Sequence, residues 1–248
     1  MINRGKIDQE YPLFMLYNKS NIPGRPASIS IHAASSSDIL GRPQNLNKYN
    51  KVLKSLTEGC ISLQKSKCKF IVIPCNTAHA PAIQDVFLEK LKQSGSDLKV
   101  LDMITETANF LQKECANVKT VGVLSTLGTW KVGFYPGLLG SFGYEVRTLS
   151  EDRQQRVHNE ALYHPEYGIK VQAHPVTTKA RNVLMDGFES LEKKGAQAII
   201  LGCTEIPLGL PERKIGETFC IDTSLILARA LIREFSPDKL IPWSWGTS

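Results

Sequence analysis

Short apolar runs alternate with longer segments of helical periodicity along most of this chain. The apolar runs lie at residues 12–18, 28–33, 70–74, 98–104, 120–126, 144–150, 198–202 and 218–222. Several are apolar at successive positions, which is typical of strands buried on both faces of a parallel sheet. Helical periodicity marks the segments 46–66, 80–94, 104–117, 130–141, 176–194 and 223–235. This alternation predicts an α/β fold with doubly wound sheets.

The apolar pattern also repeats within the chain. Residues 56–75 and 184–203 match in register at an offset of 128 positions, so that Cys75 falls on Cys203. Each copy comprises one face of a helix, a buried strand and a turn that carries the cysteine. Such a repeat indicates two similar halves, each about half of the chain.

The repeat predicts two pseudo-symmetric half-domains. We expect an N-terminal α/β domain at 1–118, which carries the first cysteine turn, and a C-terminal α/β domain at 119–225, which carries the second. We expect the last segment, 226–248, to form a helix and a tail that pack back on the N-terminal domain.

The composition is that of an ordinary soluble globular protein, with 248 residues, 42% hydrophobic and 22% charged. No run reaches the roughly 18 consecutive apolar residues of a membrane span. The first residues, MINRGKIDQEYP, lack the apolar core of a secretory signal. We therefore expect a cytoplasmic protein with no membrane partner. The net charge of +6 comes from scattered Lys and Arg residues, which argues against a nucleic-acid partner and is compatible with an anionic small substrate.

Six cysteines occur in the chain, at positions 60, 68, 75, 115, 203 and 220. They show neither a CxxC pair nor the Cys/His spacing of a zinc site, so no structural metal is expected. A disulfide framework is not expected in a chain of this length without a secretion signal. The thiols should therefore be reduced, and most of them should be buried and inert.

Cys75 and Cys203 differ from the other cysteines in their local setting. They stand in PCNTAH and GCTE, at the carboxyl ends of predicted buried strands, where open α/β sheets bind ligands. A helix is predicted after each turn, and a helix N-terminus lowers the pKa of a thiol. The neighbours Asn76, Thr77 and Thr204 offer donors and acceptors suited to a polar ligand. A single cysteine at a strand end is more often core than catalytic, but two in matching turns favour chemistry.

Three kinds of chemistry can use these thiols. A redox pair requires the sulfurs to meet, yet neither turn has the CxxC arrangement of such pairs. A cysteine–histidine hydrolase can combine Cys75 with His79, but it leaves Cys203 without a role. Two thiols on opposite sides of one carbon can instead remove a proton from one face and return one to the other. This racemisation or epimerisation accounts for the repeat, because mirror-image substrates require the same groups with the acid and base roles exchanged.

PCNTAH and GCTE resemble the two catalytic motifs of the aspartate/glutamate racemase superfamily, which works without pyridoxal phosphate. YNKSNIPGRP resembles the family segment that ends in Pro-x-Arg, TVGVLSTLGTWKVGFY its central strand and Thr-x-x-Thr turn, YGIKVQ its Lys-bearing helix, and FCIDT the strand after the second cysteine. Glu205 stands where glutamate racemases carry His, as in the aspartate racemase and broad-specificity amino-acid racemase branch. The resemblance implies two flavodoxin-like half-domains with the active site in the cleft between them, no cofactor, and a homodimer.

By the same resemblance, Cys75 and Cys203 are the two acid/base thiols of an aspartate or glutamate racemase. Arg25 and Lys170 would bind the side-chain carboxylate of the amino-acid substrate, Arg as a bidentate partner and Lys as a point charge. The residues that would hold its α-carboxylate and ammonium carry hydroxyl or amide groups, namely Asn76, Thr77, Thr126 and Thr204.

Four further positions carry physical arguments of their own. Thr126 begins a predicted helix, whose free N–H groups suit an anion. His79 can either orient a thiol or cap a helix. Asp102 and Asp222 lie at strand ends, where a carboxylate can bind the substrate ammonium or order a turn, and we favour the turn.

The chain departs from the family pattern at its start. Relatives open with a buried strand and a Gly-Gly-Met-rich turn, whereas MINRGKIDQEYPLFMLYN resembles the end of the first helix followed by the second strand. We therefore expect the first strand of the fold to be missing. This departure favours the alternative function, a catalytically impaired amino-acid-binding homologue. A hydantoin racemase or a maleate isomerase is a related alternative.

Overall fold

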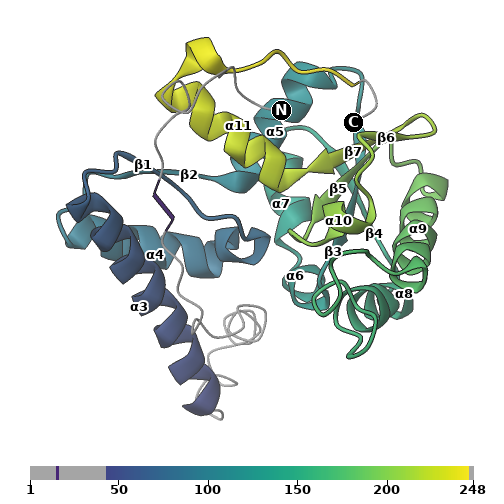
Figure 1. Cartoon of the computed structure of the whole chain (residues 1–248), viewed down its shortest axis with the longest axis horizontal. Coiled ribbons are helices and arrows are strands. Elements are labelled where there is room, and N and C mark those ends of the chain that lie inside the picture. The colour runs from purple at the N-terminus through teal and green to yellow at the C-terminus, as the bar shows by residue number, and fades with distance from the viewer. Residues whose placement is uncertain (1–14, 17–42, 246–248) are drawn as a thin grey trace. The chain divides into compact units, whose positions relative to one another are not determined.

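The computed structural model describes residues 15–16 and 43–245, which divide into two compact units. Unit 1 comprises the described residues up to Met103 together with Leu227–Pro242, and unit 2 comprises Ile104–Ile226 with the described residues from Trp243 on. Each unit has a parallel sheet and flanking helices (Figure 1). The predicted α/β fold class is confirmed. The pseudo-symmetry of the halves and the domain boundaries after residues 118 and 225 stay predictions.

Unit 1 contains two parallel strands, β1 (Phe70–Val72) and β2 (Lys99–Leu101). Its helices α3 (Pro43–Lys65) and α4 (Pro81–Gln93) pack against each other. The buried side chains of α4 recur every four residues, as one helix face requires: Ile83, Phe87 and Leu91.

Five strands form the sheet of unit 2, in the order β4-β3-β5-β7-β6. They are β3 (Thr120–Ser125), β4 (Glu145–Thr148), β5 (Ala198–Gly202), β6 (Lys214–Ile215) and β7 (Thr218–Asp222). The strands β4, β3, β5 and β7 run parallel, and β6 pairs antiparallel with β7. β5 is buried at all five positions, which accounts for its uninterrupted apolar run.

The strand order of unit 2 creates a topological switch point between β3 and β5. The chain passes from β3 to β4 on one side and then returns to β5 on the other side of β3. Ser125, the last residue of β3, pairs with Gly202, the last residue of β5. Open α/β sheets bind ligands beyond the carboxyl ends of their strands at such a point. Thr126 and Cys203, the next residues along the chain, therefore stand where this architecture binds ligands.

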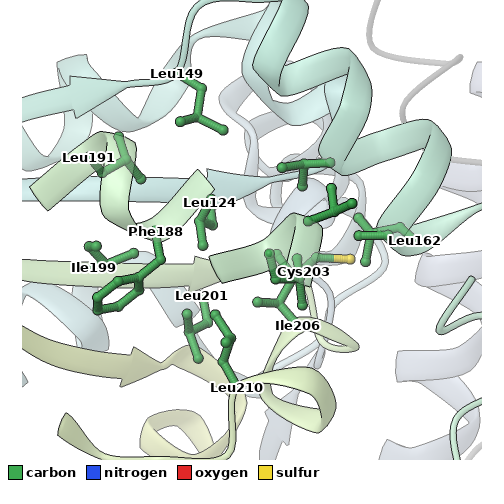
Figure 2. Close-up of a cluster of buried hydrophobic side chains, with 14 of the residues drawn as sticks. Leu124, Leu149, Leu162, Phe188, Leu191, Ile199, Leu201, Cys203, Ile206 and Leu210 are labelled. Atoms are coloured by element: carbon green, nitrogen blue, oxygen red, sulfur yellow. The ribbon is translucent and has the colours of Figure 1, made fainter. Parts of the chain in front are cut away.

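Helices connect the strands of unit 2 and cover its sheet (Figure 1). They are α6 (Leu127–Val132), α7 (Phe134–Ser141), α8 (Glu151–Arg156), the π-helix η3 (Val157–Leu162), α9 (Thr178–Lys193) and the single turn α10 (Ile206–Gly209). Figure 2 shows Phe188 and Leu191 of α9 packed with Ile199 of β5 in the apolar core. None of the described helices is both long and apolar enough to span a membrane.

The helices α5 (Met103–Glu114) and α11 (Thr223–Phe235) each contain residues of both units, and a 3-10 turn, η4 (Pro237–Lys239), follows α11. In unit 2, the rings of Trp243 and Trp245 lie 4.8 Å and 5.9 Å from the ring of Phe110, measured between centroids. The packing of the whole segment 226–248 on an N-terminal domain stays a prediction.

Each strand predicted between residues 70 and 222 coincides with an observed strand, and the small strand β6 was not predicted. The predicted helix at 130–141 is two helices, because Gly133 adopts a left-handed conformation, with φ of 66°, that ends α6. The helices α8 and η3 were not predicted either. The predicted strands at 12–18 and 28–33, apart from Met15 and Leu16, lie outside the described residues. The expectation about the first strand of the fold falls in the same part of the chain and stays a prediction.

Candidate active site

A polar cluster lies at the carboxyl end of the central strand of unit 2. The Cys203 thiol donates a hydrogen bond to Oε2 of Glu205 at 2.9 Å. Thr204 Oγ1 donates to the same oxygen at 3.1 Å. Lys170 forms an ion pair with the other carboxylate oxygen, Oε1. These four residues, called the Cys203 cluster below, combine a thiol, a hydroxyl, an ammonium and a carboxylate at the switch point of the sheet.

The apolar core of unit 2 borders this cluster. Cys203 is itself a member of that core, and its side chain is 8% exposed. Figure 2 shows its sulfur at the end of β5, directed away from Phe188 and Leu191. The thiol therefore lies between a dry interior and a polar edge.

The Cys203 thiol is held in its neutral form. Burial, followed by the negative charge of Glu205, raises its pKa to about 12, and the opposing influence of Lys170 is smaller. We expected a helix N-terminus to lower this pKa, and for Cys203 that expectation is wrong. The helix after it, α10, has only four residues, so its dipole is weak and loss of solvation dominates.

Glu205 and Lys170, the two ionisable neighbours of Cys203, are both charged at neutral pH. Burial acts to raise the pKa of Glu205, but the hydrogen bonds from Cys203, Lys170 and Thr204 lower it overall. Burial likewise acts to lower the pKa of Lys170, yet its neighbours Cys203 and Glu205 hold it above the usual value. The resting cluster therefore contains one ammonium, one carboxylate and a neutral thiol.

A tight turn after the π-helix brings Lys170 to the cluster. The N–H groups of Ile169 and Lys170 donate to the carbonyl oxygens of Ala161 and Leu162, at 2.9 Å and 3.1 Å. Gly168 allows this close approach, since a Cβ atom there would lie 2.5 Å from the backbone nitrogen of His164. The turn thus places Lys170, which is 35 residues from Glu205 in the chain, in contact with the Glu205 carboxylate.

His158, which the sequence did not single out, lies beside Lys170. Its Nδ1 accepts a hydrogen bond from the N–H of Leu127 at 3.4 Å. Its ring centroid is 4.4 Å from that of Tyr163, and Lys170 Nζ lies 5.2 Å from the Tyr163 ring. Burial, and then the charge of Lys170, lowers the pKa of His158, so the imidazole is neutral at pH 7. His158 belongs to η3, and a period of 3.6 residues does not reveal a π-helix, which is often found at functional sites.

Thr126 caps the short helix α6. Its Oγ1 accepts a hydrogen bond from the N–H of Thr129 at 3.3 Å and donates to Thr129 Oγ1 at 3.1 Å. The N–H of Leu127 is bonded to His158. These two N–H groups are therefore occupied, and the idea that they receive an anion lacks support. The binding role of Thr126 stays a prediction.

The first cysteine turn lies in unit 1. Cys75 is partly exposed and precedes the single 3-10 turn η2 (Asn76–His79), whose four residues are all buried. The Ile73 carbonyl accepts hydrogen bonds from the N–H of Cys75 at 2.7 Å and from Nε2 of His79 at 2.9 Å. His79 Nδ1 lies 3.0 Å from Asp102 Oδ2, beyond the end of β2. His79 thus ties the cysteine turn to the neighbouring strand end.

The structure places the predicted site residues in two groups. Thr204 and Lys170 contact Glu205 beside Cys203, whereas Asn76 and Thr77 directly follow Cys75 in the chain. Arg25 lies outside the described residues.

The structure also bears on the role of Asp222 and on possible metal ligands. The Asp222 carboxylate accepts hydrogen bonds from the N–H groups of Ser224 and Leu225 at 2.9 Å and 3.1 Å, so it orders the start of α11. Within the described ranges, the His, Cys, Asp and Glu side chains form no group of three that could hold a metal ion. That no cofactor is required stays a prediction.

Comparisons with known proteins agree on one family. Residues 3–231 match the model of a family described as Asp/Glu/hydantoin racemase. The broad-specificity amino-acid racemase RacX of Bacillus subtilis is 27% identical over 187 residues, which cover 75% of this chain and 74% of RacX. The glutamate racemase of Enterococcus faecalis is 29% identical over 150 residues, 60% of this chain and 48% of that racemase. This chain therefore aligns with about half the length of that relative.

A solved structure extends the likeness over nearly the whole chain. The aspartate racemase of Picrophilus torridus superposes with a TM-score of 0.69 at 25% sequence identity. The superposition covers 97% of this chain and 86% of that one.

Proposed function

The chain belongs to the Asp/Glu/hydantoin racemase family, and we propose that it is a cofactor-independent amino-acid racemase that acts on aspartate or glutamate. The observation that carries this proposal is the Cys203 cluster at the switch point of the unit 2 sheet. It supplies a thiol for proton transfer and a lysine for a carboxylate. Support also comes from the aspartate racemase fold and from the relatives named as racemases.

In the proposed mechanism, the thiols of Cys75 and Cys203 act on opposite faces of the substrate Cα. One thiolate removes the α-proton while the other thiol supplies a proton to the opposite face, and the roles exchange for the mirror-image substrate. Because that proton is very weakly acidic, preorganised donors must stabilise the charge that develops on the carboxylate. Asn76, Thr77, Thr126 and Thr204 are the proposed donors, and Arg25 and Lys170 the proposed partners of the side-chain carboxylate.

The proposal includes a homodimer in the cytoplasm, as the family resemblance implies. Analytical ultracentrifugation of the purified chain tests the dimer. A sedimentation coefficient of the monomer at all concentrations would contradict it.

Proton exchange in D₂O tests the activity itself. The protein is incubated with L-aspartate and with L-glutamate, and deuterium at Cα and optical rotation are followed together. We expect deuterium to enter Cα as the rotation declines towards zero. No exchange with either substrate or with a broad panel of amino acids rejects the racemase. Tight binding of an amino acid without exchange would then support the alternative, an amino-acid-binding homologue.

A further inference from the structure

His79 makes contacts that the proposed mechanism does not use. Its side chain is only 2% exposed, and it ends the 3-10 turn that follows Cys75. Nε2 lies 2.9 Å from the carbonyl oxygen of Ile73. Nδ1 lies 3.0 Å from Oδ2 of Asp102 and 3.2 Å from Oε1 of Gln84. Both ring nitrogens of this buried side chain therefore face oxygen atoms.

These contacts decide where the ring protons lie. A backbone carbonyl oxygen can only accept a hydrogen bond, so Nε2 must carry a proton to bond the oxygen of Ile73. An ionised carboxylate can also only accept, so Nδ1 must carry a second proton to bond Asp102. Either neutral form of the ring would turn a nitrogen lone pair towards an oxygen at 3.0 Å or less. A ring with both protons is an imidazolium cation.

We propose that His79 is a buried imidazolium that favours the thiolate of Cys75, so that the first cysteine is the base in the resting protein. The carboxylate of Asp102 compensates the charge of this cation in the interior. The inference rests on the proposed racemase function, in which Cys75 exchanges protons with Cα, and it adds a positioning residue. His79 acts through Cys75 and does not touch the substrate.

The imidazole lies directly beside the backbone of the first cysteine. The carbonyl oxygen of Ile73 bonds Nε2 of His79 and also accepts from the N–H of Cys75 at 2.7 Å. One oxygen atom thus joins the ring to the cysteine. The N–H of Ala78 donates to the Cys75 carbonyl oxygen at 3.0 Å and closes the turn between them. All four residues of that turn are buried, so little water screens the cation from the thiol.

The two motif cysteines consequently rest in different forms. Burial, and then the charge of Glu205, raises the pKa of Cys203 to about 12 and keeps that thiol neutral. Cys75 is instead partly exposed, and its turn holds the cation. A cation beside a thiol favours the thiolate. A resting pair of this kind can begin proton transfer, because one sulfur accepts a proton while the other supplies one.

NMR of the wild-type chain with 15N-labelled histidine rings tests the cation directly. The chain contains five histidines, and the His79 signals are assigned by their loss in His79→Gln. At about pH 7 both ring nitrogens of His79 should carry a proton. A neutral ring at this pH would overturn the proposal.

Alkylation by iodoacetamide at about pH 7, followed by peptide mass spectrometry, tests the effect on the thiol. Cys75 and Cys68 are both partly exposed, so the ratio of their rates corrects for access to the reagent. In the wild type, Cys75 should react at least about tenfold faster than Cys68. In His79→Gln, which removes the charge, this ratio should fall about tenfold, and Cα deuterium exchange should fall with it. His79→Lys restores a cation and should recover part of the ratio.

His174→Gln serves as the matched control. His174 is exposed and lies outside both cysteine turns, so the same substitution there should leave the ratio at the wild-type level. Cys60 reports folding, because it is buried in α3 of unit 1 and should stay slow to alkylate in every folded variant. If His79→Gln fails to fold, the NMR measurement on the wild type still decides the charge of the ring.

Two results of the alkylation assay would contradict the proposal. An unchanged ratio in folded His79→Gln would show that His79 only shapes the turn. A fall in the ratio that His79→Lys does not recover would assign the loss to shape and not to charge. Neither the NMR nor the alkylation measurement needs a substrate. A wild-type chain that exchanges no amino acid in D₂O would therefore reject the racemase function, while the state of His79 is reported separately.

Discussion

At the scale of single residues, the cysteines fall into two groups. Cys203 contacts a carboxylate, and Cys75 is partly exposed at the start of a buried 3-10 turn. Cys60, Cys115 and Cys220 are buried, and burial raises their pKa values to between about 11 and about 12. Cys203 is buried too, with a pKa raised to about 12, so what distinguishes it from these three is the hydrogen bond from its thiol to Glu205.

Serine substitutions test this division. Cys75→Ser and Cys203→Ser should each reduce racemisation by on the order of 10³-fold or more, because a hydroxyl is a far weaker acid than a thiol. Cys68→Ser alters a partly exposed thiol outside both motifs and should keep wild-type activity. The measurement is optical rotation with aspartate or glutamate. Full activity after loss of either motif cysteine contradicts the two-thiol mechanism.

The ion pair of Lys170 and Glu205 predicts a pH dependence of stability. The pKa of Glu205 is lowered from 4.5 in the folded chain. The stability that its carboxylate contributes is therefore present above pH 4.5 and is lost as pH falls through the folded pKa. The pKa of Lys170 is raised from 10.5, so its contribution is present below that value and is lost at higher pH. We therefore compare the free energy of unfolding of wild type with that of Glu205→Gln. The difference between the two should be constant between about pH 6 and 9 and should shrink in acid. Urea unfolding measures it, and a difference that is unchanged at about pH 3 would contradict the pair.

At the scale of elements, the π-helix and the turn after it position the lysine of the cluster. The apolar runs predicted the strands from β1 to β7 except β6, because burial on both faces requires apolar side chains throughout. The polar segment of α8 and η3 has too little apolar periodicity to be predicted. The residues that this segment contributes, among them His158, were missed for the same reason.

The turn at Gly168 can be tested with an alanine. In Gly168→Ala the new Cβ would lie 2.5 Å and 2.8 Å from the backbone nitrogen and oxygen of His164, so the turn must open and Lys170 must move. We expect a loss of about 1–3 kcal/mol in the free energy of unfolding and a clear fall in racemisation. Urea unfolding and the racemisation assay measure both.

Gly140→Ala provides the control. Gly140 lies in α7, and a Cβ there would meet no atom within 4 Å. This variant should gain up to about 1 kcal/mol of stability and keep its activity, because alanine favours the helix. A Gly168→Ala protein that behaves like Gly140→Ala would refute the role of the turn.

At the scale of the whole molecule, buried thiols predict loss of stability in alkali. Cys60, Cys115, Cys203 and Cys220 have folded pKa values of about 11 to about 12, against an ordinary 9.0. Above pH 9 the unfolded chain loses these protons first, so each thiol lowers the free energy of unfolding by up to ~1.4 kcal/mol per pH unit until its folded pKa is passed. Below pH 9 the effect is absent.

Urea unfolding of wild type and Cys220→Ala at pH 8, 9 and 10 isolates the contribution of one thiol. The stability of the variant should decline less steeply with pH than that of wild type. Equal slopes for the two proteins would contradict the assignment. The comparison cancels the titration of Lys and Tyr side chains that both proteins share.

The sequence by itself determined the α/β class, the strands around both cysteines, and the racemase resemblance that the family match confirms. These follow from local patterns, because apolar runs report burial and short motifs are contiguous in the chain. Only the tertiary structure showed that Lys170 and Cys203 share Glu205, and that His158 lies beside them. Such meetings depend on the turn after a π-helix and on the pairing of β3 with β5, which bring together side chains 35 residues apart. The same packing removes water from Cys203 and raises its pKa, so burial reversed the effect that the motif alone predicted.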